Sequence, residues 1–207
     1  MTSRPRIDQA EGLRRMFAHT RALFVPVVAN PSVAFSGVLL ERLCAGFSER
    51  GATVLVVDAG ERARPAGEMA LVELAQCIEA LGGSTYFLAA RGLAVRFVDS
   101  AGSTRACLQR IAEAAPYCDV ILVHASASEL ARLFAHRGSD AASAAEMPCA
   151  VVLVDDRPDS VTHAYTAMKL LAQRADLLVF DLVLAAAAHS PRAERIVAKL
   201  SSCADDF

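Results

Sequence analysis

The chain lacks the features that mark several common classes of protein. Its formal net charge is −2, so there is no overall positive charge that would predict nucleic-acid binding. The six cysteines form no C-x-x-C pair, which favours free thiols over a disulfide set or a metal site. No apolar run is long enough to span a bilayer, and the polar, charged N-terminus does not resemble a signal peptide. We therefore expect a cytoplasmic protein without a direct membrane anchor.

Residues 22–58 are the stretch around which the chain is organised. Residues 22–29 form an apolar run that is typical of a strand buried on both faces. A short loop over 30–37 precedes a helix whose apolar face repeats every four residues, at Leu39, Leu43 and Phe47. A second buried strand over 53–57 then ends at Asp58. This order predicts a strand, loop, helix and strand unit.

The rest of the chain continues the alternation of strands and helices. No linker divides residues 21–207, whose length and hydrophobic fraction of 54% suit one domain with a sizeable core. The alternation predicts a parallel sheet covered by helices on both faces, with ligands at the carboxyl ends of the strands. Helices are expected over 68–81, 103–115, 127–136, from Pro158 with Ser160 as N-cap, and over 191–201; strands over 85–90, 94–98, 119–124, 149–154 and 177–184; and a loop over 138–145.

The loop over 30–37 lies where a P-loop would hold phosphate, but it lacks the residues of that motif. The template G-x-x-x-x-G-K-[ST] needs glycines that turn amides toward phosphate, a lysine that neutralises charge, and a hydroxyl for magnesium. We expect Phe35 to fill the space of the phosphate. The fixed positions of the template are occupied here by Asn30, Phe35, Ser36 and Gly37.

Three polar residues stand at strand positions that carry charge in nucleotide switches. Asp58 ends the second strand, where it is either a catalytic base or a turn-forming residue. His124 ends the strand over 119–124 in place of an acidic residue. A polar strand end is favoured over a metal ligand because no partner ligands have suitable spacing. Asp181 stands in a late strand that often supplies an Asn for the base. No catalytic constellation can be assigned from these positions.

The N-terminal segment is amphipathic. Between residues 7 and 17, one helical face carries Ile7, Ala10, Leu13 and Phe17, and the other face is charged. An isolated helix of this length is marginal in water, so it must dock on its own domain or be ordered by a partner. Both alternatives are compatible with the pattern.

Three stretches resemble the MinD/ParA branch of P-loop ATPases. They are Gly-Ala-Thr-Val-Leu-Val-Val-Asp-Ala over 51–59, Cys-Asp-Val-Ile-Leu-Val over 118–123, and Pro-Asp-Ser-Val-Thr-His-Ala-Tyr-Thr-Ala-Met-Lys over 158–169. The resemblance covers roughly residues 22–201. It implies a three-layer, P-loop NTPase-like fold of the MinD (SIMIBI) type, with a mostly parallel sheet.

The segment before this domain narrows the resemblance. Residues 8–14 match the D-Q-A-x-x-L-R motif of the FlhG family, also called FleN or YlxH, whose members are MinD-like regulators of flagellar number. The resemblance implies that residues 1–20 engage the GTPase FlhF and stimulate its GTP hydrolysis, and that Gln9 reaches toward the nucleotide. A glutamine supplied in trans can orient the attacking water. The motif residues are Asp8, Gln9, Ala10, Leu13 and Arg14.

The chain departs from the family where nucleotide would bind. The two family lysines align with Pro31 and Ser36, the magnesium hydroxyl with Gly37, and the later acidic residue with His124. We therefore expect no ATP or magnesium cofactor, no other metal and no catalytic residues of its own. The favoured hypothesis is a non-catalytic regulator that binds an FlhF-like GTPase and is recruited by a partner to the cell pole. The alternative is a MinD/ParA-type nucleotide-binding ATPase with an altered P-loop.

Overall fold

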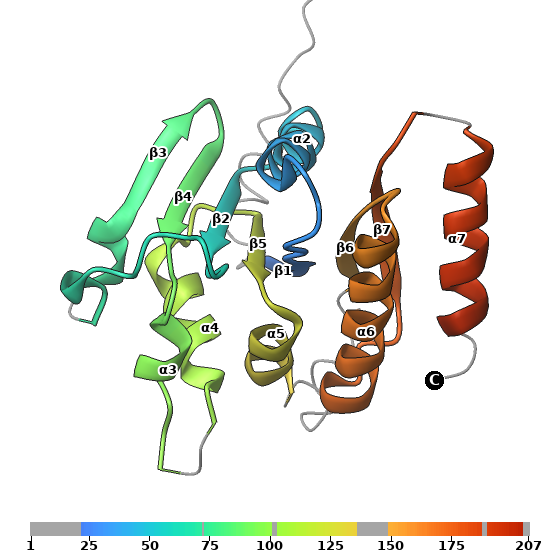
Figure 1. The fold of residues 1–207 in the computed structure, drawn as a ribbon. Helices are drawn as coiled ribbons and strands as arrows, with labels where there is room; N and C mark the ends of the chain where they lie inside the picture. Colours follow the sequence, from blue (N-terminus) through green and yellow to red (C-terminus); the bar gives the residue numbers. More distant parts are fainter. Residues whose placement is uncertain (1–21, 72, 101–102, 136–148, 188–189, 205–207) are drawn as a thin grey trace, which may run out of the picture.

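A computed structural model describes residues 22–71, 73–100, 103–135, 149–187 and 190–204 (Figure 1). Their centre is a seven-stranded sheet in the order β3-β4-β2-β5-β1-β6-β7. All neighbouring strands are parallel except β3 and β4, which pair antiparallel. The strands are β1 (Leu23–Val28), β2 (Val54–Asp58), β3 (Ile78–Gly82), β4 (Thr85–Ala89), β5 (Val120–Ala125), β6 (Ala150–Asp155) and β7 (Phe180–Ala185).

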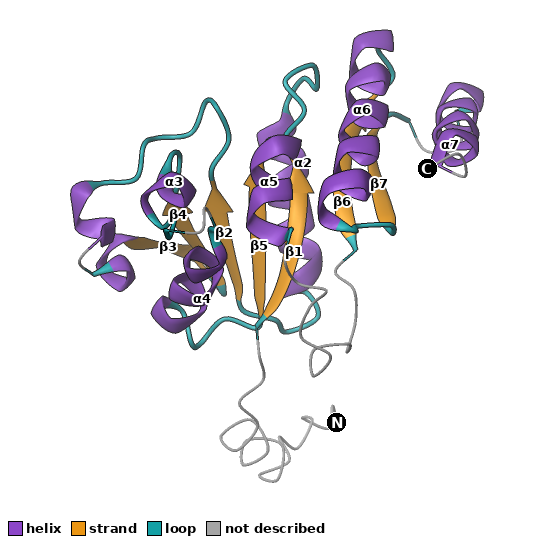
Figure 2. Ribbon diagram, turned by 90° about the horizontal axis from the view of Figure 1, so that it is seen from below, coloured by secondary structure: helices purple, strands orange, loops and turns teal. Residues whose placement is uncertain are grey.

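Helices cover both faces of the sheet, as the sequence predicts. Figures 1 and 2 show α2 on one face and α4, α5 and α6 on the other, with α7 beside α6. Two 3-10 turns, Glu68–Leu71 and Leu74–Cys77, precede β3. The α-helices are α2 (Ser36–Ser48), α3 (Leu93–Arg96), α4 (Arg105–Ala114), α5 (Ala127–Phe134), α6 (Pro158–Ala175) and α7 (Pro191–Ala204).

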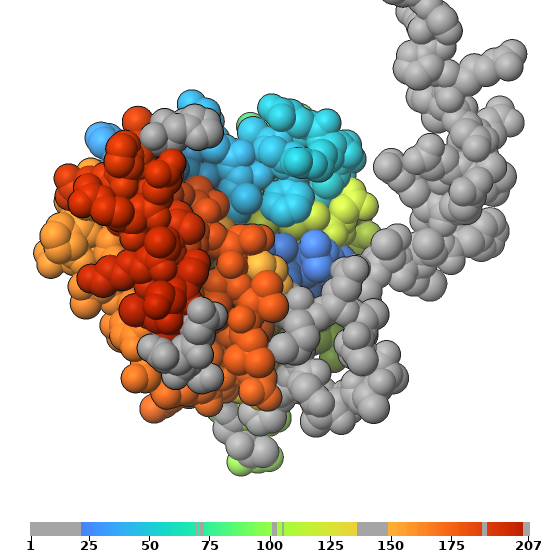
Figure 3. All heavy atoms as spheres, turned by 90° about the vertical axis from the view of Figure 1, so that its right-hand side faces the viewer, coloured from blue at the N-terminus to red at the C-terminus, as the bar shows by residue number. Residues whose placement is uncertain are grey.

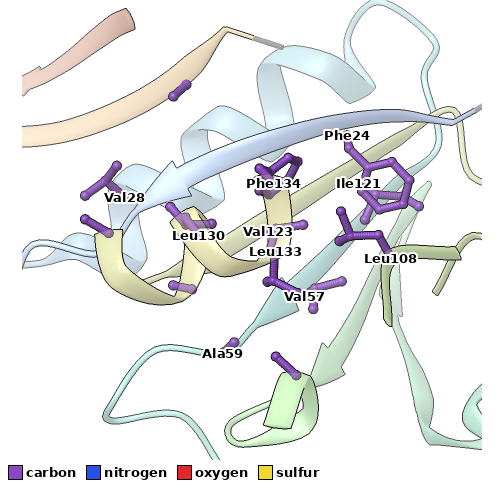
Figure 4. Packing of buried hydrophobic residues seen from close by; sticks show 14 of the residues in the cluster. Phe24, Val28, Val57, Ala59, Leu108, Ile121, Val123, Leu130, Leu133 and Phe134 are labelled. Carbon is purple, nitrogen blue, oxygen red and sulfur yellow. The ribbon is translucent and has the colours of Figure 1, made fainter. Parts of the chain in front are cut away.

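The central strands are buried on both faces, because alternate side chains enter two separate cores. In β5, Ile121 and Val123 pack on the α5 side, where Phe134 is only 1% exposed (Figure 4). Val120 and Leu122 enter the smaller core on the α2 side. The near-continuous apolar runs of the sequence therefore become the middle of the sheet.

The predicted helix over 68–81 is wrong. Its C-terminal part is strand β3, and its N-terminal part consists of the two 3-10 turns. Gly82 and Gly83 have φ values of 122° and 57°, so they form a hairpin turn into β4 rather than a helix end. Main-chain pairing between β3 and β4 overrides the apolar spacing, which also fits a helix.

The predicted strand over 94–98 is also wrong. Leu93–Arg96 form the short helix α3, and Gly92 precedes it with a φ of 76°. Leu93 and Ala94 are buried in the larger core. A short apolar run cannot be distinguished as strand or helix by periodicity, and here packing beneath the sheet decides.

Some predictions lie outside the described residues. These are the helix over 7–17 with its motif residues, and the loop over 138–145. The division into residues 1–20 and 21–207 therefore stays a prediction. Within the described ranges, no helix is long and apolar enough to cross a membrane.

Candidate functional site

The polar residues of the site gather at the carboxyl edge of the sheet. Strands β1, β2, β5 and β6 are parallel neighbours, so their carboxyl ends lie at one edge. Asn30 follows β1, while Asp58 and Asp155 end β2 and β6. His124 is directly opposite Asp58 in the register of β5 and β2.

Asn30 fastens the start of the 30–37 loop to β6 and α6. Its side chain is 3% exposed, and Nδ2 lies 3.0 Å from both the Leu153 and the Ser160 carbonyl oxygens. Its Oδ1 accepts a hydrogen bond from the Ser32 backbone N–H at 3.1 Å. A glycine at this position, as in a P-loop, could make none of these side-chain contacts. Where a P-loop has a phosphate-binding turn, this chain has a buried set of Asn30 hydrogen bonds, which we call the Asn30 tie.

An acidic side chain lies against the same loop. The backbone N–H of Ala34 donates a hydrogen bond to Oδ2 of Asp155 at 3.3 Å. The guanidinium of Arg157 binds the same oxygen, with Nη2 at 2.8 Å and Nε at 2.9 Å. In a P-loop the loop amides turn toward phosphate, whereas one of them here binds a carboxylate of the protein.

Ser160 lies in the first turn of α6 and binds the end of β6. The N-cap predicted at Ser160 is wrong, because Arg157 precedes the helix and Pro158 is its first residue. Ser160 is fully buried, and its hydroxyl accepts a hydrogen bond from the Asp155 backbone N–H at 2.9 Å. The proline fixes the helical φ angle two residues earlier than the serine. The hydroxyl therefore holds the end of β6.

The surroundings of Asp155 favour its charged form. Burial alone raises the pKa of this carboxyl, but hydrogen bonds from Arg157, Ala34 and Ser160 outweigh it and hold the pKa below the ordinary value. The side chain is 8% exposed. The loop therefore faces an ionised carboxylate that is paired with Arg157 at neutral pH.

Phe35 does not fill the place of the phosphate, contrary to the prediction. Its side chain is 81% exposed, and its backbone has a φ of 61° in the left-handed region. Val33 is the loop residue that packs inward, at 6% exposed. The left-handed turn at Phe35 directs the ring toward solvent and starts α2 without a side-chain cap. A bulky residue in this conformation is strained.

Asp58 and His124 form a pair at the ends of β2 and β5. His124 Nδ1 lies 2.9 Å from Asp58 Oδ1, and the Gly60 backbone N–H donates to the same oxygen at 3.1 Å. His124 Nε2 is buried and makes no hydrogen bond to any described residue. A Cβ at position 60 would lie 3.2 Å from Asp58 Oδ1, so glycine suits this close approach. The two side chains therefore bind each other at the carboxyl ends of β2 and β5.

The pair lowers the pKa of Asp58. Burial of the carboxyl raises its pKa, while the hydrogen bond and the charge of His124, together with the Gly60 N–H, lower it by more. Asp58 therefore stays ionised and occupied by its partners. The hydrogen bond from the Gly60 N–H is the contact that a turn-forming Asp58 would make, and the alternative of a catalytic base stays a prediction.

Asp181 does not join the other residues. It is the second residue of β7 and pairs in register with Val151, four residues before Asp155 in β6. At roughly 3.3 Å per residue it lies about 13 Å along the sheet from the carboxyl edge. Asp181 is therefore distant from Asp58, His124 and Asp155 at the carboxyl edge. Among the described residues, no group of three or more His, Cys, Asp or Glu side chains is placed to hold a metal.

The other residues that stand at P-loop positions in the 30–37 loop are exposed or half-buried. Pro31 and Gly37 are exposed, and Ser36 is half-buried as the first residue of α2. Nothing lies within 4 Å of a Cβ built on Gly37, so no close approach requires glycine there. Neither Pro31 nor Ser36 has the charge or the side-chain length with which a lysine reaches phosphate, and Gly37 has no side chain.

The most informative residue, Asp155, was not predicted from the sequence. Its signal is the same as that of Asp58, because it is an acidic residue that directly follows a buried apolar strand. Recognising it requires knowing that β6 is the neighbour of β1. That neighbour relation follows from the strand order, which residues 149–155 do not encode locally.

Comparisons with known proteins support the fold. No protein-family model and no curated protein sequence matches the chain. Among solved structures, the MinC:MinD cell division complex of Aquifex aeolicus aligns with a TM-score of 0.57 and 15% identity, covering 87% of this chain and 78% of that one. A ParA family ATPase from Chlorobium tepidum TLS aligns with a TM-score of 0.61 and 11% identity, covering 89% and 81%.

A third similar structure was determined with nucleotide. Cobyrinic acid a,c-diamide synthase from Mycobacterium smegmatis, with bound ADP and magnesium, aligns with a TM-score of 0.60 and 12% identity over 87% of this chain and 81% of that one. The chain therefore has the MinD/ParA-type P-loop NTPase fold. At these identities the likeness concerns the fold alone.

Proposed function

We propose that this protein is a non-catalytic, MinD-like regulator of flagellar number and placement. It binds a GTPase of the signal-recognition type, FlhF, through residues 1–20 and stimulates GTP hydrolysis by that partner. It works in the cytoplasm and reaches the cell pole through a partner. It needs neither ATP nor magnesium.

The observation that carries the non-catalytic part is the hydrogen bond from Ala34 to Asp155. A loop that bound nucleotide would present its amides and a lysine to phosphate. This loop presents an amide to a buried carboxylate, and Asn30 ties it to β6 at the other end. The domain is then a scaffold that does not depend on nucleotide.

The activating part rests on the D-Q-A-x-x-L-R resemblance of residues 8–14. The apolar face of Ile7, Leu13 and Phe17 lies in a groove of the partner, as amphipathic segments do when they bind. Gln9 is off that face and contacts the attacking water beside the bound GTP. Asp8 and Arg14 fix the orientation through charged contacts at the rim.

The test is GTP hydrolysis by purified FlhF with the native protein and two variants. Gln9→Ala keeps binding but loses the stimulation, because only the water-orienting amide is removed. Leu13→Asp loses both, because a charge replaces an apolar contact. Binding is measured separately by calorimetry, with Gln109→Ala on α4 as a matched control that leaves both unchanged.

Two outcomes contradict the proposal. Full stimulation by Gln9→Ala removes the mechanism, because the helix would then act without the glutamine. No binding of the native protein to FlhF removes the partner as well.

The second hypothesis is a MinD/ParA-type ATPase with an altered P-loop that acts in polar localisation or secretion. The observation in its favour is that Asp58 ends β2 in a fold that holds ADP and magnesium in a similar protein. ATP hydrolysis by the native protein that is abolished in Asp58→Ala would support this function over the first.

A further inference from the structure

A basic groove runs between α6 and α7. Its volume is about 320 Å³, and both helices begin at the carboxyl edge of the sheet (Figure 1). One wall is the first two turns of α6 and the other is one face of α7. We define this groove by its lining residues Asp156, Pro158, Val161, Thr162, Arg192, Arg195, Ile196 and Lys199.

Three of the lining side chains are cations on one face of α7. Arg192, Arg195 and Lys199 follow the spacing i, i+3, i+7, which places them on one side of a helix. They span about 10 Å along the axis, at roughly 1.5 Å per residue. Figure 3 shows α7 on the outside of the molecule, in red. All three cations are exposed, so this face is accessible in the described part of the chain.

The cations are only partly neutralised. Arg192 binds Asp156 twice. Its Nη1 lies 3.3 Å from the carboxylate Oδ2 of Asp156, and its Nη2 donates to the backbone carbonyl oxygen of Asp156 at 2.6 Å. Arg195 donates to the Pro191 carbonyl oxygen in its own helix. Within the described ranges, neither Arg195 nor Lys199 makes an ion pair. The groove thus keeps a local positive charge on a protein whose net charge is −2.

The bottom of the groove is apolar. Ile196 is 9% exposed and Val161 is half-buried, with Pro158 beside them. Among the described residues, no aromatic side chain lines the groove, so these residues offer no surface on which a base could stack. An occupant that satisfies both features carries several carboxylates and at least one apolar side chain.

We propose that the groove between α6 and α7 binds an acidic, amphipathic segment of a partner protein. The carboxylates of the segment meet Arg195 and Lys199, and its apolar side chains cover Val161 and Ile196. Charge complementarity sets the orientation and speeds encounter, while the apolar contact adds affinity. The surface lies outside residues 1–20 and is independent of the proposed contact with FlhF.

The probe is a fluorescein-labelled synthetic helix of roughly 15 residues that alternates pairs of glutamate and leucine, a length at which isolated helices begin to form. Fluorescence anisotropy with the full chain measures its affinity. Arg195→Glu/Lys199→Glu weakens binding by about tenfold, because two attractive contacts become repulsive. Arg42→Glu/Arg50→Glu, with one position in α2 and the other just after it, changes the net charge equally and leaves the affinity within twofold of the native value.

Two further probes separate the alternatives. A peptide with glycine in place of leucine binds at least fivefold more weakly if the apolar bottom contributes. Phosphatidylserine vesicles test whether the cations serve a membrane surface instead. The proposal is overturned if the native protein does not bind the Glu–Leu peptide, if both charge-reversed variants lose the same affinity, if removing leucine changes nothing, or if the vesicles bind and the peptide does not.

Discussion

The backbone N–H of Ala34 donates its hydrogen bond to the carboxylate of Asp155, across 121 positions of sequence and 3.3 Å of space. Asp155 thereby occupies an amide of the loop that in a P-loop faces phosphate. Arg157 balances the charge of the carboxylate, and Ser160 holds the strand end that carries it. The groups that would contact phosphate in a P-loop therefore contact other residues of this protein. Each of these contacts can be removed by a single substitution.

The first prediction concerns nucleotide. Titration with ATP and magnesium in a calorimeter gives no binding at micromolar concentrations, because lysines are absent from the loop and Asp155 already occupies the Ala34 amide. Thermal melts with and without ATP coincide, since a ligand that does not bind the folded state adds no stability. Micromolar binding of ATP, shared by a phosphate-only analogue, would contradict both statements.

The second prediction concerns the buried tie at Asn30. Asn30→Ala removes the buried side-chain donor to the Leu153 and Ser160 carbonyl oxygens and lowers the free energy of unfolding by about 2–4 kcal/mol. Asn30→Asp lowers it further, because a carboxylate then faces two carbonyl oxygens. Urea unfolding measures both, and Ser32→Ala is the control, with an expected change within about 0.5 kcal/mol. Equal stability of all three variants would show that the tie contributes nothing.

The third prediction concerns the strained backbone at Phe35. Phe35→Gly raises the free energy of unfolding by about 0.5–1 kcal/mol, because glycine adopts the left-handed conformation without the steric penalty. Phe35→Ala keeps the penalty and loses little burial, so it changes stability by less than about 0.5 kcal/mol. A large loss of stability in Phe35→Ala would mean that the ring is packed rather than exposed. Thermal and urea unfolding report both variants.

The fourth prediction concerns acid. The pKa of Asp155 is lower in the folded protein than its ordinary value, so its stabilising contribution is complete above that ordinary value, near 4. The contribution is lost as the pH falls through the folded pKa. Urea unfolding between about pH 6 and pH 3 therefore shows a steeper loss in the native protein than in Asp155→Asn. Asp176→Asn, at an exposed position, removes the same charge and should retain the native slope; parallel curves for all three proteins would exclude the effect.

Local patterns in the sequence were sufficient for much of the fold. The apolar runs around Phe24, Leu55 and Ile121 predict strands buried on both faces, and these are the central strands of the sheet. The spacing of Leu39, Leu43 and Phe47 predicts the face of α2 that packs on the sheet. Such signals can be read because side-chain period and burial act within a few residues. The absence of lysine from the 30–37 loop is visible in the same way.

Contacts between distant residues were decided only by the tertiary structure. Strand β3 exists because β4 offers it hydrogen bonds, although its apolar spacing also fits a helix. Phe35 faces solvent because its backbone is in the left-handed conformation. The residue type at position 35 does not predict that conformation. Asn30 meets Ser160 across 130 positions, and Asp155 meets Ala34, because the strand order brings β6 beside β1. Periodicity specifies which side of an element is buried, but the neighbour that buries it depends on the packing of the whole chain.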